Sequence, residues 1–439
     1  MQAIGLVELT RNMSVTFGRQ AVAALLGFIT LAIIARTYGP EGNGIFALAL
    51  LLPSVLVTFM NLGMAPANVY HLGSAQISPR DLVAANLKLF FPTASLGLAI
   101  GAMLLSWYGD ALFPGVEYFV LWLALLAFPI SFLNVLLHSI FQGLERFQAY
   151  NVIAIAQPLA LLFLVGSLAI MGNREIAVLV GAQLASLFFG LALSIKLLIP
   201  LTRKQDGATT SQKFWKRTLS YGFRAHLSNV LSFLNYKADI FLVNLFLGPA
   251  AVGVYVVAVV LVERLWLISQ AVSTVLLPRL SRLLSQKAHD DLLSPMIARW
   301  VMALTSVAAL VVALLSGPII LLVFGAEFGG AVLVVLILLP GVVLLSPARI
   351  IANDLAARNR PELNMYTDAA VVAINIVANV LMIPRYGLNG AAAATTLAYA
   401  MGLTGRLWIY GRLTGNRWVD TLLLKHEDIR KVGAFVRKS

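Results

Sequence analysis

The chain of 439 residues has no cysteine and few charged residues. The absence of cysteine excludes a disulfide framework and thiolate chemistry. Asp, Glu, Lys and Arg make up 12% of the sequence, against roughly 25% in soluble globular domains. Hydrophobic residues make up 60%. Such a chain cannot cover a water-facing surface, which excludes soluble enzymes, coiled coils and disordered proteins.

Familiar catalytic motifs are missing as well. The sequence has no Gly-Lys pair and hence no P-loop, and it has neither His-Glu-x-x-His nor Gly-x-Ser-x-Gly. Its 5 histidines show no metal-ligand spacing. We therefore expect a protein that is not an enzyme and that has no cofactor and no metal site.

The sequence does have long hydrophobic runs. An α-helical membrane span needs about 20 apolar residues, and we predict twelve spans of this kind, which makes the chain an all-α polytopic membrane protein. They cover residues 14–36, 44–67, 86–107, 117–140, 150–171, 176–199, 219–246, 252–277, 297–316, 329–352, 365–384 and 389–411.

The net charge of +13 follows from this topology. When the N-terminus is placed inside, only Arg36, Arg174 and Arg385 carry positive charge at the outer span ends and in the outer loops. This bias predicts that both termini are cytoplasmic. The basic residues then need no nucleic-acid partner to explain them, and we expect none.

An internal repeat divides the chain. Gly39-Pro40-x-x-x-Gly44 returns 209 residues later as Gly248-Pro249-x-x-x-Gly253. We predict two parallel six-helix lobes that form a V around a central cavity, as in transporters that work by alternating access. The predicted parts are an N-terminal lobe, a cytoplasmic linker, a C-terminal lobe and a basic cytoplasmic tail, at residues 1–200, 201–218, 219–412 and 413–439.

Basic residues inside spans are costly and usually face a cavity or a partner. Arg19 and Arg224 lie at matching depths in the first helix of each half, and Lys88 and Arg299 are matched by the repeat. Because Arg binds phosphate with a bidentate fork, this set predicts a site for a diphosphate group, with structural pairing as the alternative. Arg406 lies close enough to a helix end to reach the membrane surface.

Polar stripes follow several spans. Amide and hydroxyl side chains suit sugar hydroxyls, and they also hold membrane helices together. The candidates for sugar binding are Ser228, Asn235, Asn134, Asn375 and Asn379. The acids within the spans are candidates for ion coupling or for charge pairs, and they are Asp239, Glu263 and Asp368.

These residues resemble a known family. Residues 35–49 (ARTYGPEGNGIFALA) and the segment from Asp239 through Leu247-Gly248-Pro249 to Tyr255 are similar to signatures of the polysaccharide transport family. Residues 383–392 (IPRYGLNGAA) resemble the turn before its last helix. The resemblance covers about residues 10–412. Within that family, the chain resembles the Wzx-type flippases, which belong to the MOP (MATE-like) superfamily.

The resemblance implies a function and a place. Such flippases move undecaprenyl-diphosphate-linked oligosaccharide repeat units from the cytoplasmic to the periplasmic leaflet of the bacterial inner membrane, for O-antigen, capsule or exopolysaccharide synthesis. It also implies ion coupling, and partners such as a polysaccharide polymerase and a chain-length regulator.

Three alternatives stay open at this point. A multidrug exporter for organic cations shares the fold, but the basic, amide-rich interior argues against it. A lipid II flippase usually has fourteen spans. A polymerase or ligase of lipid-linked glycans needs a sizeable outer loop with catalytic residues, which this sequence does not offer.

Overall fold

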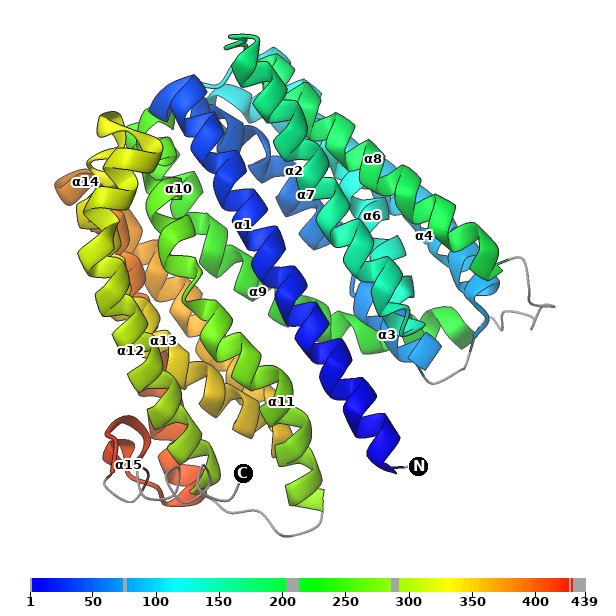
Figure 1. Cartoon of the computed structure of the whole chain (residues 1–439), viewed down its shortest axis with the longest axis vertical. Helices are drawn as coiled ribbons and strands as arrows, with labels where there is room; N and C mark the ends of the chain where they lie inside the picture. Colours follow the sequence, from blue (N-terminus) through cyan, green and yellow to red (C-terminus); the bar gives the residue numbers. More distant parts are fainter. Residues whose placement is uncertain (1, 74–76, 203–212, 286–291, 426–427, 429–439) are drawn as a thin grey trace. The chain divides into compact units, whose positions relative to one another are not determined.

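A computed structural model describes residues 2–73, 77–202, 213–285, 292–425 and 428 (Figure 1). Nearly all of them are helical. The helices are α1 (Gln2–Ala49), α2 (Leu51–Met60), α3 (Met64–Gly73), α4 (Pro79–Leu112), α5 (Tyr118–Leu125), α6 (Ala127–Gly143), α7 (Phe147–Ile170), α8 (Ile176–Thr202), α9 (Lys213–Leu247), α10 (Pro249–Glu263), α11 (Trp266–Ser285), α12 (Leu293–Ile319), η1 (Ile320–Phe324), η2 (Ala326–Phe328), α13 (Ala331–Ala357), α14 (Pro361–Thr414) and α15 (Trp418–Leu422).

Local sequence signals fix the helix ends. Before α4, the Ser78 Oγ accepts a hydrogen bond from the Asp81 N–H at 3.1 Å, and Pro79 occupies the first helical position. Both features are favoured at helix N-termini because the first N–H groups have no partner within the helix. At the other end of the chain, Gly415 closes α14 with a left-handed φ of 75°, as glycine commonly does.

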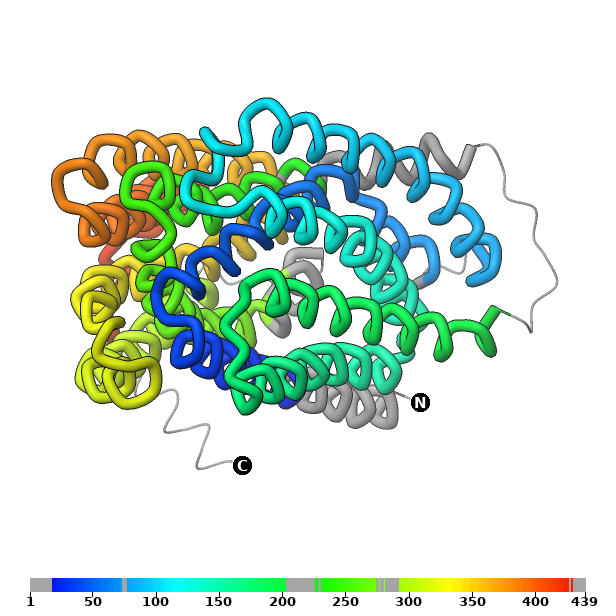
Figure 2. Tube along the Cα trace, turned by 90° about the horizontal axis from the view of Figure 1, so that it is seen from above, coloured from blue at the N-terminus to red at the C-terminus, as the bar shows by residue number. Residues whose placement is uncertain are grey.

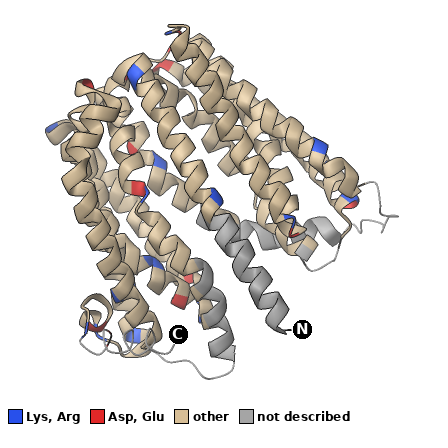
Figure 3. Cartoon of the chain, viewed as in Figure 1, with Lys and Arg blue, Asp and Glu red and all other residues tan. Residues whose placement is uncertain are grey.

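The expectation of a membrane protein is confirmed. Among the described residues, 9 helices are long and apolar enough to cross a membrane, or 10 when α10 and α11, bent by 43°, count as one span. Their outer faces carry large apolar side chains such as Ile170 (90% exposed) and Leu322 (76% exposed). Figure 3 shows how few charged residues lie along these helices. The chain is a multi-pass membrane protein.

Two of the long helices are interrupted by glycine. Gly39 in α1 has φ 68° and ψ −174°, and Gly387 in α14 has φ 59° and ψ −138°, so each helix consists of two helical segments. Side chains with a Cβ rarely adopt such backbone angles. Twelve crossings would require the run 18–60, which joins α1 and α2, and α14 to cross twice each, and that number stays a prediction.

The chain forms two compact units, which are described separately. The first comprises residues 1–233 and 247–253, and the second comprises 234–246 and 254–439. The predicted division at 201–218 is untested, and residues 203–212 lie outside the described part. In the first unit α7 packs beside α1 and α8 (Figure 2). Leu82, Phe141, Ile153 and Leu198 are among the buried side chains of its core.

In the second unit α13 lies between α12 and α14 (Figures 1 and 2). The buried core here includes Leu280 from α11, Val301 from α12, Ile351 from α13 and Tyr410 from α14. This core fixes the positions of the polar side chains that these helices carry, which are described below.

The repeated Gly-Pro motif makes a reciprocal contact in the first unit. A Cβ on Gly44 would collide with the Pro249 carbonyl, and a Cβ on Gly253 would collide with the Pro40 carbonyl. The Asn43 side-chain amide donates to the Gly253 carbonyl at 2.9 Å. Glycine is therefore required at both positions by close approach of two backbones.

Candidate functional site

The first unit contains a polar cavity of about 410 Å³. One face of α6 supplies most of it, because Ser131, Asn134, His138 and Gln142 recur every three to four residues. Tyr150 and Gln157 of α7 complete the polar part of the lining. The predicted sugar-binding residue Asn134 thus faces a cavity.

Arg19 lies beside this cavity. Its Cζ is 5.0 Å from the centre of the Tyr150 ring, a cation–π distance, and the His138 ring lies 5.8 Å from the same ring. Within the described part, Arg19 Nε, His138 Nε2 and Asn134 Oδ1 are buried without a hydrogen-bond partner. Buried polar atoms without partners are costly, so this group is suited to a ligand that has both anionic and hydroxyl groups.

Asp239 is the centre of a second polar site, in the other unit. Its carboxylate is 5% exposed and accepts hydrogen bonds from Thr395 Oγ1 at 2.6 Å, Asn379 Nδ2 at 3.0 Å and Tyr255 Oη at 3.0 Å. Asn375 lies beside them, and its Oδ1 accepts a hydrogen bond from Asn379 Nδ2 at 3.2 Å. All these partners are neutral, and within the described residues Asp239 forms no ion pair.

A cavity of about 20 Å³ adjoins this carboxylate, enough for one water-sized occupant. Asn235, Tyr236 and Glu263 also line it. The Oδ1 atoms of Asn235 and Asn379 are buried, and the structure gives them no hydrogen-bond partner. One carboxylate with amide and hydroxyl oxygens is a donor set for a hard cation. The Asp239 site could therefore hold a small cation or a proton.

Arg349 also lies near this site, although it is not among the site residues predicted from the sequence. It lies within α13, where its guanidinium donates to Tyr236 Oη at 2.8 Å and its Cζ is 4.8 Å from the Trp266 ring centre. Glu263 interacts electrostatically with Lys237, Arg264 and Arg349. The signal for Arg349 in the sequence is a polar stripe with Ser346 and Asn353 at spacings of three and four residues.

Other candidates have different surroundings. Asp368 forms an ion pair with Arg406, whose side chain is only 8% exposed. The prediction that Arg406 reaches the membrane surface is wrong, because Asp368 is its partner inside the unit. Lys88 lies on an exposed face of α4 beside Phe91, which is 64% exposed. The side chains of Arg224 and Ser228 lie outside the described residues.

The guanidinium of Arg299 forms an ion pair with Asp428 in the C-terminal tail. Its Nε and Nη2 each lie 2.7 Å from a carboxylate oxygen of Asp428, and Nη1 donates to the Asp420 carbonyl. The two charged side chains are 6% and 4% exposed. Because Asp428 occupies the guanidinium N–H groups that would bind phosphate, we no longer consider Arg299 a candidate phosphate ligand.

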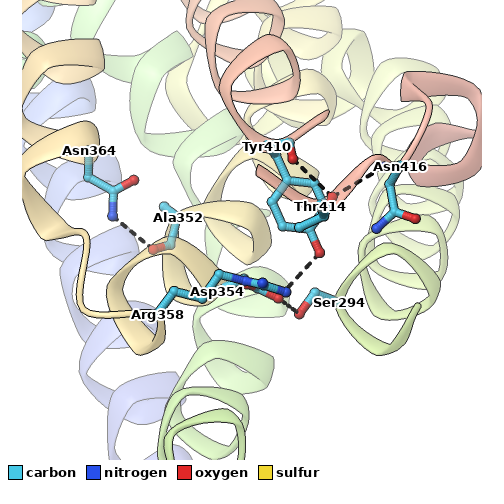
Figure 4. Close-up of polar contacts among 8 residues, drawn as sticks. All are labelled: Ser294, Ala352, Asp354, Arg358, Asn364, Tyr410, Thr414 and Asn416. Carbon is cyan, nitrogen blue, oxygen red and sulfur yellow. Dashed lines mark hydrogen bonds and ion pairs between the residues drawn. The ribbon is translucent and has the colours of Figure 1, made fainter. Parts of the chain in front are cut away.

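A second buried carboxylate stabilises the same end of the second unit (Figure 4). Asp354 of α13 accepts hydrogen bonds from Ser294 of α12, from Arg358 and, at 3.4 Å, from Tyr410 of α14. The Asn416 N–H then donates to Thr414 Oγ1 at 3.3 Å. These contacts fix the end of α14 and the turn into α15.

The ion pair between Arg299 and Asp428 yields a prediction about the tail. Burial raises the pKa of Asp428, but the hydrogen bonds from Arg299 and the Lys425 N–H outweigh it, so the pKa lies below its usual 3.8. The stabilisation is therefore complete above pH 3.8 and is lost as the pH falls through the lowered pKa. Asp428→Asn should release the tail at neutral pH, at a cost of about 3–5 kcal/mol for the unpaired Arg299.

Limited proteolysis of the tail measures this release, with Glu362→Gln as the control because the ion pair of Glu362 is exposed. Tail cleavage of Asp428→Asn at the wild-type rate would contradict the assignment.

Comparison with known proteins agrees with this architecture. The sequence profile of a family described as polysaccharide biosynthesis protein matches residues 9–284. The chain is 24% identical over 414 residues to a putative O-antigen transporter of Shigella flexneri, covering 90% of this chain and 95% of the relative. It is 27% identical over 239 residues to the probable low-salt glycan biosynthesis flippase Agl15 of Haloferax volcanii, covering 54% of this chain and 49% of that relative.

Solved structures with a similar fold include a flippase and a multidrug resistance transporter. The lipid II flippase MurJ in an inward closed conformation gives a TM-score of 0.73 at 16% identity, covering 90% of this chain and 87% of the other. An inward-facing MATE multidrug resistance transporter of the MOP superfamily gives 0.70 at 14% identity, covering 90% and 95%. The chain has the fold of the MOP superfamily and belongs to the polysaccharide biosynthesis protein family.

Proposed function

We propose that this protein is a flippase that moves a lipid-linked oligosaccharide across a bacterial inner membrane for surface polysaccharide synthesis. The similarity to a putative O-antigen transporter over 90% of the chain carries this proposal. The substrate is an undecaprenyl-diphosphate-linked repeat unit, translocated from the cytoplasmic to the periplasmic leaflet by alternating access. Both termini are cytoplasmic, and a polymerase and a chain-length regulator use the product.

Arg19 binds the diphosphate of this substrate. Its guanidinium is oriented by Tyr150, and its Nε is buried with an unused N–H, which can form a charge-assisted hydrogen bond with phosphate. Asn134 and His138 line the adjoining cavity and offer hydrogen bonds to sugar hydroxyls. Asn235, Asn375 and Asn379 belong to the Asp239 site instead, so we now assign them to coupling.

Asp239 couples transport to an ion. A proton or a small monovalent cation neutralises the carboxylate, and the hydroxyl groups of Thr395 and Tyr255 turn from donors into acceptors or cation ligands as it binds. Because a ligand shifts an equilibrium only through its different affinity for two conformations, the Asp239 site must differ between the inward- and outward-open states. Glu263 and Arg349 adjoin the site through Tyr236.

The test is a flipping assay in proteoliposomes that contain an undecaprenyl-diphosphate-linked oligosaccharide, with a glycosidase outside to report exposed sugar. Loss of a charge-assisted contact of about 1.5–3 kcal/mol predicts that Arg19→Gln slows flipping by roughly 10- to 100-fold. Lys196→Gln is the matched control, because Lys196 is exposed on α8 and should flip at the wild-type rate.

Other outcomes separate the alternatives. Wild-type flipping by Arg19→Gln would reject Arg19 as the diphosphate ligand but keep the flippase. Transport of lipid II in preference to the oligosaccharide would identify a lipid II flippase. Efflux of an organic cation, without any flipping, would identify a drug exporter.

A further inference from the structure

An apolar groove of about 700 Å³ lies at the end of the second unit, and it shares no lining residue with the Asp239 site. Leu344 of α13 and Leu403 and Leu407 of α14 form its wall, and Leu422 of α15 closes it. Its volume and apolar lining suit a hydrocarbon chain.

Two arginines stand at one end of this groove. Arg412 lies over the Trp408 ring with its Cζ 4.3 Å from the ring centre, and Arg417 directly precedes α15. Both side chains are exposed, and neither forms an ion pair with any residue that the structure describes. No acidic side chain belongs to the described lining. Asp420 of α15 interacts electrostatically with Arg417, but its ion pair is with Lys425. The groove therefore joins an apolar chain site to a cationic end.

The tryptophans place this end at a membrane surface. Trp408 and Trp418 are 60% and 61% exposed and flank the arginines. Tryptophan is enriched at the level of the lipid headgroups, and basic residues collect on the cytoplasmic side. Since the charge bias of the chain predicts a cytoplasmic C-terminus, the arginines lie at the leaflet in which anionic lipids contact cytoplasmic basic residues.

The groove is built by fixed elements. The Arg299–Asp428 ion pair and the bond from Arg299 to the Asp420 carbonyl hold α15 against α12. The Asp354 contacts fix the end of α14 (Figure 4), and α14 carries Trp408 and Arg412. Both walls of the groove are thus positioned by buried polar contacts before any lipid binds.

We propose that this groove is a binding site for one anionic phospholipid. An acyl chain lies along Leu344, Leu403 and Leu407, and the phosphate group binds between the guanidinium groups of Arg412 and Arg417. The positive charge of the groove and the absence of a lining carboxylate favour a lipid with net negative charge over a zwitterionic one. The site is independent of the transported substrate.

Native mass spectrometry of the full-length protein in detergent tests this assignment. Dioleoyl phosphatidylglycerol and dioleoyl phosphatidylethanolamine have the same chains, so their difference reports the headgroup. We expect one phosphatidylglycerol to be retained in preference, and the double variant Arg412→Gln/Arg417→Gln to bind it about 10- to 30-fold more weakly. Arg385→Gln, an exposed arginine outside the groove, should bind like the wild type.

A second variant separates lipid binding from folding. Thr404 is exposed and lines the groove, so Thr404→Trp should block the acyl chain while both arginines remain. Equal retention of the two phospholipids, or unchanged binding by both variants, would overturn the proposal. Displacement of phosphatidylglycerol by an equal amount of undecaprenyl phosphate would also overturn it, and would assign the groove to the isoprenoid substrate.

Discussion

Replacement of Asp239 by Asn is expected to abolish ion-driven transport while the protein stays folded. Asn has nearly the same shape, and the neighbouring Thr395 and Tyr255 hydroxyls can accept as well as donate, so the hydrogen-bonded site survives without its charge. Coupling free energies of about 1–3 kcal/mol correspond to about 5- to 150-fold effects. The stimulation of flipping by an imposed sodium or proton gradient should therefore disappear in the variant.

The control for this experiment is Glu327→Gln, because Glu327 is an exposed acid in η2. It should respond to the gradients as the wild type does. A persistent gradient response in Asp239→Asn would exclude Asp239 from coupling. An equal loss of flipping with and without a gradient, together with a lower melting temperature, would instead make Asp239 a structural residue.

The second large effect is expected at the repeated glycines. A single methyl group at Gly44 or Gly253 would collide with a backbone carbonyl, which cannot move aside as a flexible side chain can. Overpacking typically costs about 1–3 kcal/mol, and a backbone obstacle places these substitutions at the upper end. Gly44→Ala and Gly253→Ala should each lower the temperature at which the detergent-solubilised protein loses its monodisperse elution peak.

Gly166→Ala is the matched control, because a Cβ at Gly166 would meet nothing within 4 Å. Since Ala favours the helix over Gly by about 1 kcal/mol, this variant should be as stable as the wild type or more so. If Gly44→Ala were equally stable, the close contact of the two motifs would not be required for folding.

The membrane helices were predictable from the sequence because apolar length is a local property. In the long run at 361–414, hydropathy predicts spans at 365–384 and 389–411, and the helix breaks at Gly387, between the two. The helical run itself begins at Pro361 and ends at Thr414, beyond the outer ends of both predicted spans. Polar residues at helix ends continue the backbone hydrogen bonds and are invisible to a hydropathy window. The Gly-Pro repeat was visible, but its close backbone contact was not.

The sites were predictable in their residue types and much less in their partners. Helical spacing on α6 predicted the polar face with Asn134, which lines a cavity. Two of the three hydrogen-bond partners of Asp239, Asn379 and Thr395, lie 140 and 156 residues away in sequence, and no local pattern specifies such pairs. Arg299 was predicted to be a substrate ligand because its partner Asp428, 129 residues further on, could not be recognised from the sequence.

The position of Asp428 bears on how the chain can be shortened. A basic terminal tail is the part of a membrane protein that is usually trimmed to improve behaviour in detergent. A truncation before residue 428 would leave Arg299, only 6% exposed, without its counter-ion, and a buried unpaired charge strongly destabilises its surroundings. It would also loosen α15, one wall of the lipid groove. Any shortening of the tail should therefore retain Asp428.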